Sequence, residues 1–272
     1  MNSIPIADSF RYTTEMAKPL IDKVFFLDKV DAAVFVDFGC ADGTMLGFID
    51  RIFPDVDLVG FDNNEEMLEI ARTQNPGGRT SIHYTSSWNE VLEIVVRARA
   101  QDKKTCLVLS SVIHEAYSYL SETELTAMWK RIWGESEAVF DYIAIRDMMV
   151  SRSTTRPADP LQVARIRQVF DRKRLDEWEA QWGSIDENWS LVHFLLTYRY
   201  EHSWKREVKE NYLPVSYEEF LSTIPPRYLP IFKEHFTLPF LRRRVREDFG
   251  FDIADRTHLK LVLEADRAQQ KR

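Results

Sequence analysis

Two apolar runs that each end in an acidic residue constrain the fold of this chain most. The first, Val34-Phe35-Val36, ends in Asp37 and leads into a turn of small residues, and the second ends in Gly60-Phe61-Asp62. Neither run alternates apolar with polar residues, which is typical of strands buried on both faces. Between them, apolar residues at helical spacing cover positions 43–53, and Pro54 ends that pattern. The segment therefore predicts a strand, a turn, a helix and a second strand.

The same alternation continues to about residue 150. Further strands are expected at 81–84, 105–110 and 138–145, and helices at 64–74, 89–100 and 122–133. Strands that alternate with helices through short links form a parallel sheet with helices on both faces. An earlier stretch, residues 9–30, also has helical spacing.

The pattern changes after residue 150. Helical spacing covers 161–182, 191–210 and 217–223, and no convincing strand occurs before Pro225-Pro226. Near the end, His258–Leu263 is another apolar run that predicts a strand. The back half therefore combines a helical segment with late strands.

The turn after the first strand is the natural place for a ligand, because open parallel sheets bind ligands beyond the carboxyl ends of their strands. Such a turn needs very small residues where backbone N–H groups approach the ligand, and Gly39, Ala41 and Gly43 supply them. A dinucleotide site with the pattern G-x-G-x-x-G would place glycines at positions 41 and 44, which are Ala41 and Thr44 here. The spacing therefore disfavours a dinucleotide.

The pattern Asp37-x-Gly39-x-Ala41-x-Gly43, with Asp62 after the second strand, resembles the cofactor site of the class I methyltransferases, which use S-adenosyl-L-methionine (SAM). Ala41 stands at the second of the three glycine positions of the family form. The resemblance implies an α/β, Rossmann-like sheet that is mostly parallel and is closed by a late antiparallel hairpin. His258–Leu263 fits its last strand and Ile231–Phe236 is the expected partner.

The resemblance also divides the chain. Residues 1–150 would form an N-terminal helix and the SAM-binding core, residues 151–225 a helical insertion on the acceptor side, and residues 226–272 the closing strands of the sheet.

Carried onto this sequence, the resemblance implies a set of cofactor-binding residues: Asp37, Gly39, Cys40, Ala41, Gly43, Asp62, Asn63, Ser86, Ser87 and Ser110. Asp62 would accept hydrogen bonds from the ribose hydroxyls, and Asp37 would orient the turn or meet the methionine ammonium group through water. Asn63 and the two serines 86 and 87 would lie at the adenine. The alternative for each strand-end acid is that it caps the following helix.

Candidate acceptor chemistry follows the fourth strand. The segment Ser110 to Tyr117 is similar to the "V-L-H-H" segment of many small-molecule methyltransferases, and His114 is the matching residue. His114 would act as a general base, or it would only pack and hydrogen-bond at a helix start. Tyr12, Tyr117, Arg146 and Arg199 are the candidate acceptor-binding residues; Arg146 could instead pair with its neighbour Asp147. No cysteine or histidine pair has the spacing of a metal site.

Charge distribution separates the possible acceptors. The net charge is −7, and residues 1–150 carry −10 while residues 151–272 carry +3. An acidic front half disfavours long polyanions, so a small-molecule acceptor is favoured. RNA is the alternative, because aromatic and basic residues are interleaved in the helical segment and Arg242-Arg243-Arg244-Val245-Arg246 is a basic cluster. A solvated helix face explains that cluster equally well. A further alternative is a non-catalytic SAM-binding subunit.

The expected location is the cytoplasm, without a membrane partner. No stretch approaches the roughly 18 apolar residues of a membrane span. The N-terminus lacks the pattern of a secretory signal, and the two cysteines do not form a disulfide framework.

Overall fold

The computed structural model describes residues 20–78, 81–134 and 139–267. Their strands form one seven-stranded sheet in the order β3-β2-β1-β4-β5-β7-β6. The strands are β1 (Val34–Phe38), β2 (Asp57–Phe61), β3 (His83–Thr85), β4 (Thr105–Ser110), β5 (Tyr142–Met148), β6 (Tyr228–Phe236) and β7 (His258–Ala265). The first five are parallel, and β7 pairs antiparallel with both β5 and β6. The predicted mostly parallel sheet with a late antiparallel hairpin is confirmed.

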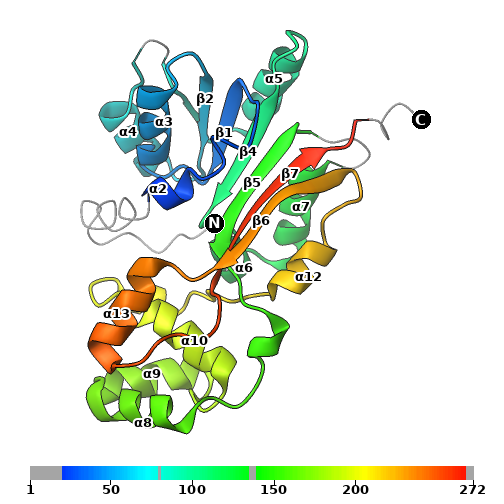
Figure 1. Ribbon diagram of the computed structural model, residues 1–272. Coiled ribbons are helices and arrows are strands. Elements are labelled where there is room, and N and C mark those ends of the chain that lie inside the picture. The colour runs from blue at the N-terminus through cyan, green and yellow to red at the C-terminus, as the bar shows by residue number, and fades with distance from the viewer. Residues whose placement is uncertain (1–19, 79–80, 135–138, 268–272) are drawn as a thin grey trace.

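Helices cover both faces of this sheet (Figure 1). One face packs against α2 (Leu20–Lys23), α3 (Thr44–Ile52) and α4 (Glu65–Gln74). The other packs against α5 (Trp88–Arg99), α6 (Ile113–Tyr119), α7 (Glu122–Trp133) and α12 (Tyr217–Ser222). The interior strands are apolar because both of their faces are buried; every residue of β5 is buried.

A separate helical layer lies beyond the end of the sheet at which β5 ends (Figure 1). It contains the 3₁₀ turn Arg152–Thr154, α8 (Pro160–Val169), α9 (Arg172–Trp182), α10 (Asn188–Thr197), α11 (Trp204–Glu207) and α13 (Pro239–Phe249). These helices share an apolar core that includes Trp178, Phe194 and Phe249. The helix α13 therefore packs with this layer, although it lies between the last two strands in the sequence.

Two helices expected as single long elements are divided. The expected helix 161–182 breaks at Phe170, whose backbone is extended, and Asp171 caps the next helix by accepting from the Arg174 N–H at 2.8 Å. The expected helix 191–210 ends at Thr197 and a short helix begins at Trp204. Local capping rather than apolar spacing sets these ends.

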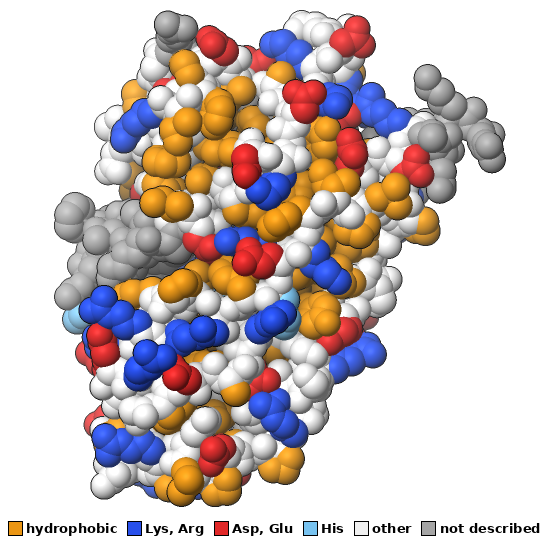
Figure 2. Space-filling model, viewed as in Figure 1, with side chains coloured by type: hydrophobic (Ala, Val, Ile, Leu, Met, Phe, Trp, Pro, Cys, Tyr) orange, Lys and Arg blue, Asp and Glu red, His pale blue; other side chains and the backbone are white. Residues whose placement is uncertain are grey.

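The surface of the helical layer carries a group of basic side chains over α13 (Figure 2). Three of its arginines pair with nearby carboxylates: Arg243 with Glu247, Arg244 with Asp248, and Arg246 with Asp252. The basic cluster seen in the sequence is thus a solvated helix face that is largely neutralised by its own neighbours. None of the helices in the described part of the chain combines the length and the apolar composition needed to cross a bilayer.

Candidate cofactor and acceptor site

The turn after β1 has an unusual backbone that brings two strand ends together. Gly39, Ala41 and Gly43 have φ angles of 77°, 46° and 72°, in the left-handed region that glycine adopts most readily. The backbone N–H groups of Gly39 and Cys40 donate to the Phe61 carbonyl at 2.8 and 3.1 Å. Because β1 and β2 are neighbours, the turn folds over the end of β2.

Asp62 fixes this turn from the other side. Its Oδ2 accepts from the Ala41 N–H and its Oδ1 from the Asn64 N–H, both at 2.9 Å. Burial raises the pKa of Asp62, and these backbone donors oppose the rise. The following helix is capped by Asn64, which accepts from the N–H groups of Glu66 and Met67. Asp62 therefore links the two strand ends and keeps lone pairs for further donors.

Asp37 is buried at the end of β1, 4% exposed, beside a cation that the sequence reasoning missed. Burial raises the pKa of Asp37 to about 7, and the charge of Lys23 opposes this. Burial, and then the charge of Arg146, lowers the pKa of Lys23 to about 8. Lys23 is 8% exposed at the end of α2. No motif marks Lys23, because α2 reaches the strand ends only in the folded chain.

The residues expected at the adenine have local partners. Ser87 caps α5 by accepting from the Glu90 N–H, and Ser86 donates to Glu65 at 2.6 Å. Asn63 is exposed. The sequence reasoning did not single out an aromatic cluster at the ends of β1 and β2. There the rings of Phe38 and Phe61 lie 5.0 Å apart, and both contact Trp88.

The segment after β4 brings Ser110, Ser111 and His114 to the end of β5. The Ser110 hydroxyl is buried without a hydrogen-bond partner in the described part of the chain. Ser111, with φ of 59°, accepts from Arg146 Nη1 at 2.8 Å. Arg146 and Asp147 do not pair with each other: Arg146 Nε donates to Asp22 at 2.9 Å, whereas Asp147 accepts from the Ile113 N–H and from His114. Successive residues of a strand point to opposite faces, which explains this separation.

His114 is held between two buried carboxylates. Its Nδ1 donates to Asp147 Oδ1 at 2.8 Å, and its Nε2 lies 4.0 Å from Glu210 Oε2. Burial lowers the pKa of His114, but the carboxylates of Asp147, Glu115 and Glu210 together raise it, to about 9. The imidazole is therefore protonated at neutral pH, which argues against the role of general base. Asp147 and Glu210 were missed as site residues because both lie far from His114 in the sequence.

Glu210 extends this network into the helical layer. Its Oε1 accepts from Arg206 Nε at 2.8 Å and from the Tyr119 hydroxyl at 2.7 Å, and Arg206 also contacts Glu115. Ligand atoms of His114, Glu115 and Glu210 lie within 4.8 Å of one another. The guanidinium of Arg206 and the imidazolium already supply positive charge at this cluster.

The remaining predicted acceptor residues are dispersed. Tyr12 lies outside the described residues. Tyr117 packs on the opposite face of the sheet core from Arg146, near Trp129. Arg199 lies in the helical layer, where its Nη2 donates to the Tyr200 hydroxyl at 2.7 Å and its Nε is buried without a partner among the described residues. The structure brings His114 and Arg146 to neighbouring positions after β4 and in β5, and Arg199 approaches from the other side of the junction.

Comparison with known proteins finds similarity to methyltransferases. No protein-family model matches the chain. A segment of 78 residues is 32% identical to trans-aconitate 2-methyltransferase from Variovorax paradoxus, and it covers 29% of this chain and 30% of that protein. The match therefore spans less than a third of the relative. The strand order with its reversed β7 is that of the class I methyltransferases. Over that segment the chain is similar to a SAM-dependent methyltransferase, and its sheet has the class I methyltransferase strand order.

Solved methyltransferases are also found at low identity. The methyltransferase domain of bacterial CtHen1 has a TM-score of 0.49 at 12% identity, covering 92% of this chain and 98% of that one. A SAM-dependent methyltransferase from Anabaena variabilis has a TM-score of 0.44 at 13% identity, covering 97% and 98%. The plantazolicin methyltransferase BamL, solved with a desmethyl analogue and SAH, has a TM-score of 0.46 at 11% identity, covering 95% and 89%.

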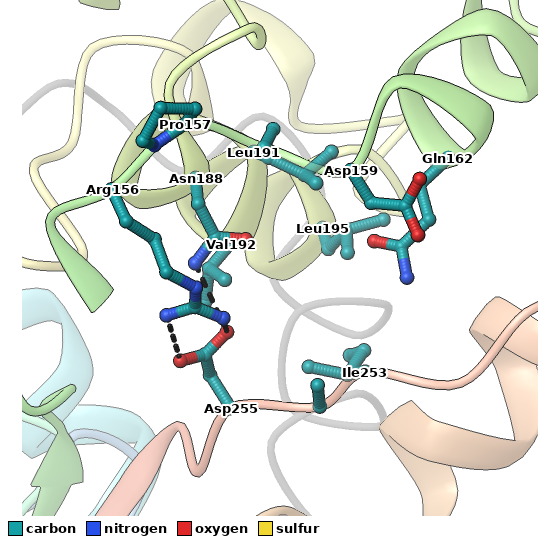
Figure 3. Close-up of a pocket in the computed structure, with 12 residues that line it drawn as sticks. Arg156, Pro157, Asp159, Gln162, Asn188, Leu191, Val192, Leu195, Ile253 and Asp255 are labelled. Carbon is teal, nitrogen blue, oxygen red and sulfur yellow. Dashed lines mark hydrogen bonds and ion pairs between the residues drawn. The ribbon is translucent and has the colours of Figure 1, made fainter. Parts of the chain in front are cut away.

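A cavity of about 320 Å³ lies elsewhere in the structure, within the helical layer (Figure 3). Its lining includes Arg156, Asn188 and Asp255, and both Arg156 and Asn188 donate to the Asp255 carboxylate. None of the predicted site residues lines it. The cavity is therefore separate from the strand ends.

Proposed function

We propose that this protein is a SAM-dependent methyltransferase with a small-molecule acceptor. The observation that carries the proposal is the hydrogen bond between Asp62 and the turn after β1, in which the Asp62 carboxylate accepts from the Ala41 N–H at 2.9 Å. Three features therefore lie around the ends of the neighbouring strands β1 and β2: a carboxylate with spare lone pairs, a turn of very small residues, and the buried Asp37. Those groups suit a ribose diol, a close backbone approach and an ammonium group, respectively.

In the proposed complex, Asp62 accepts from the ribose hydroxyls and Asp37 faces the methionine ammonium. The backbone of Gly39, Cys40, Ala41 and Gly43 lies against the cofactor, and Ser110 lies near the transferred methyl group. Asn63, Ser86 and Ser87 would border the adenine, with apolar surface from the partly exposed rings of Phe38 and Phe61. SAM supplies the electrophilic methyl group, and the protein aligns the acceptor with it and excludes water.

Two observations favour a small acceptor over RNA. The relative that matches part of this chain is named for trans-aconitate, a small molecule. The arginines of α13 that could follow a phosphate backbone pair with carboxylates of the same surface. Phosphate contacts in nucleic-acid complexes require cations that are available to the backbone.

The first prediction concerns Asp62. Asp62→Ala removes the acceptor that holds the Ala41 N–H of the turn and the proposed ribose contact, so the affinity for SAM should fall by about tenfold or more. Isothermal titration calorimetry with SAM and with S-adenosylhomocysteine measures this change. Glu93→Gln, on the exposed face of α5, is the matched control and should bind like the wild type. An Asp62→Ala variant that stays folded and binds SAM normally would remove Asp62 from the site.

The same titrations distinguish an enzyme from a binding subunit. If SAM binds but neither cellular small molecules nor RNA accept label from methyl-labelled SAM, the protein is a non-catalytic SAM-binding subunit; label in RNA would instead indicate an RNA acceptor. If SAM does not bind, the proposal fails altogether.

A further inference from the structure

Two buried guanidinium groups at the junction between the sheet and the helical layer have nitrogen atoms without a partner. Arg146 is 3% exposed, and its Nη2 is buried with no hydrogen-bond partner in the described part of the chain. The same holds for Nε of Arg199. A buried donor left unsatisfied costs about 1–3 kcal/mol, and more on a charged group. Such atoms in a native structure need an explanation, and a bound ligand that accepts from them is one.

Arg199 also lacks a carboxylate partner among the described residues. Its guanidinium donates to the Tyr200 hydroxyl and lies over the rings of Tyr200 and Phe240, at 4.7 and 5.5 Å. A buried arginine normally has an anion beside it, because desolvation of an unpaired charge is costly. The missing anion is therefore expected from outside the described residues.

The two arginines border the same junction from opposite sides. Arg146 lies on β5 next to Asp147, and Asp147 accepts the hydrogen bond from His114. Two residues after Arg146, Met148 lies opposite His258 in the neighbouring strand β7. On the other side, the ring of Tyr212 contacts both the ring of His114, at 5.0 Å, and that of Tyr200, at 6.2 Å. Burial lowers the pKa of His258, and the charges of Arg146, Arg199 and His114 lower it further. Arg146, Arg199 and His114 thus all lie close enough to His258 for their charges to act on it.

His114 contributes a third positive charge to this region rather than a base. The clamp between Asp147 and Glu210 raises its pKa to about 9, so that it already carries a proton at neutral pH. An alcohol or ammonium acceptor must lose a proton before or during methyl transfer. A carboxylate acceptor is already ionised and needs no base.

We propose that the methyl acceptor is a carboxylate oxygen of a small organic acid, whose carboxylate groups are bound by Arg146 and Arg199. This inference rests on the proposed methyltransferase function. In the reaction, a carboxylate oxygen lone pair forms the new C–O bond to the methyl carbon while the C–S bond breaks and its electron pair stays on sulfur. The products are a methyl ester and S-adenosylhomocysteine, and no proton is released.

The test uses the full chain, SAM labelled in its methyl group, and a panel of small di- and tricarboxylic acids that includes citrate and aconitate. Mild alkali hydrolyses methyl esters to volatile methanol but leaves methyl ethers and methylamines intact. The proposal predicts alkali-released labelled methanol with at least one acid. It is overturned if no acid yields ester, or if all label remains in alkali-stable products.

SAM binding, measured by calorimetry on the same preparation, distinguishes failure of the carboxylate inference from failure of the methyltransferase proposal. If SAM binds and no ester forms, the carboxylate inference fails and the methyltransferase proposal survives. If SAM does not bind, the methyltransferase proposal itself fails.

Variants test the two arginines. Arg199→Gln and Arg146→Gln should raise the KM for the acid about 10- to 100-fold, because a hydrogen bond to a charged group is lost. Arg199→Gln should leave the affinity for SAM unchanged, since Arg199 lies in the helical layer. Arg243→Gln, an exposed arginine of α13, is the matched control with unchanged KM. Folded Arg199→Gln protein with the wild-type KM would overturn the role of Arg199.

The pH dependence tests the absence of a base. With saturating SAM and acid, kcat should stay level or fall between about pH 7 and pH 10, because no proton leaves the acceptor and His114 loses its charge near the upper end. A kcat that rises tenfold per pH unit in this range would overturn the proposal. The charged and titratable groups around His114 come from several elements: Glu115 (α6), Asp147 (β5), His193 (α10), Arg206 (α11), Glu210, Tyr212 and His258 (β7).

Discussion

At the scale of a single residue, the raised pKa of the buried Asp37 carboxyl group makes the stability of the fold depend on pH, and it also favours the binding of a cation. Its pKa is about 7 in the folded protein, well above the value of about 4 in an unfolded chain. The folded state therefore holds this proton more tightly than the unfolded state, and stability falls as pH rises from about 4 to about 7. A cationic ligand beside Asp37 would relieve this cost, which is a reason for a binding site to retain it.

Asp37→Asn should therefore stabilise the ligand-free protein at high pH. Relative to the wild type, its free energy of unfolding should increase by a few kcal/mol, on the order of 2–4, between about pH 4 and pH 8. Urea unfolding at both pH values measures the change. Asp57→Asn, which removes a surface partner of Lys103, is the control and should change by less than about 1 kcal/mol. A difference that does not depend on pH would contradict the raised pKa of Asp37.

At the scale of elements, the turn after β1 is rigid because its glycines meet fixed neighbours. A Cβ atom on Gly43 would lie 2.3 Å from the Tyr84 hydroxyl, which donates to the Asn75 carbonyl at 2.8 Å. Gly183, which ends α9, has a similar φ of 85°, but a Cβ atom there would meet nothing within 4 Å beyond its own chain neighbours. Both glycines have a positive φ angle, but only Gly43 has a neighbouring side chain where a Cβ atom would lie.

Gly43→Ala and Gly183→Ala form a matched pair for this reason. Gly183→Ala should cost about 1 kcal/mol of unfolding free energy from the left-handed backbone alone. Gly43→Ala should cost about 2–4 kcal/mol, because the new methyl group also displaces Tyr84. It should also weaken SAM binding, since the turn must move. Urea unfolding of both variants measures the difference, and equal costs would show that Tyr84 does not constrain the turn.

Sequence reasoning located the elements where the pattern is local. Strand β4 matches its expected bounds, and the spacing of Gly39, Gly43 and Asp62 placed the turn beside the second strand. It missed breaks set by capping, as at Asp171, and it could not place α13, whose charged residues obscured its apolar face. The clamp on His114 was also hidden, because Asp147 and Glu210 come from distant segments that only the fold assembles.

At the scale of the whole molecule, the sheet and the helical layer meet where the proposed chemistry would occur. The sheet carries Asp37, Asp62 and Arg146 at or near the ends of β1, β2 and β5. The helical layer lies beyond the end of β5 (Figure 1), and its Arg199 lies close enough to His258 for its charge to act on it. The network from Asp147 through His114 to Glu210 and Arg206 connects the two parts. The sheet would thus hold the cofactor, and the sheet and the helical layer together would hold the acceptor.

The most direct test of this account is a crystal structure of the protein with S-adenosylhomocysteine. We predict that the nucleoside lies over the turn at residues 39–43, with both ribose hydroxyls donating to Asp62 and the amino group facing Asp37. Density for the ligand elsewhere, for example in the cavity beside Arg156 and Asp255, with the strand ends closed by side chains, would contradict the assignment.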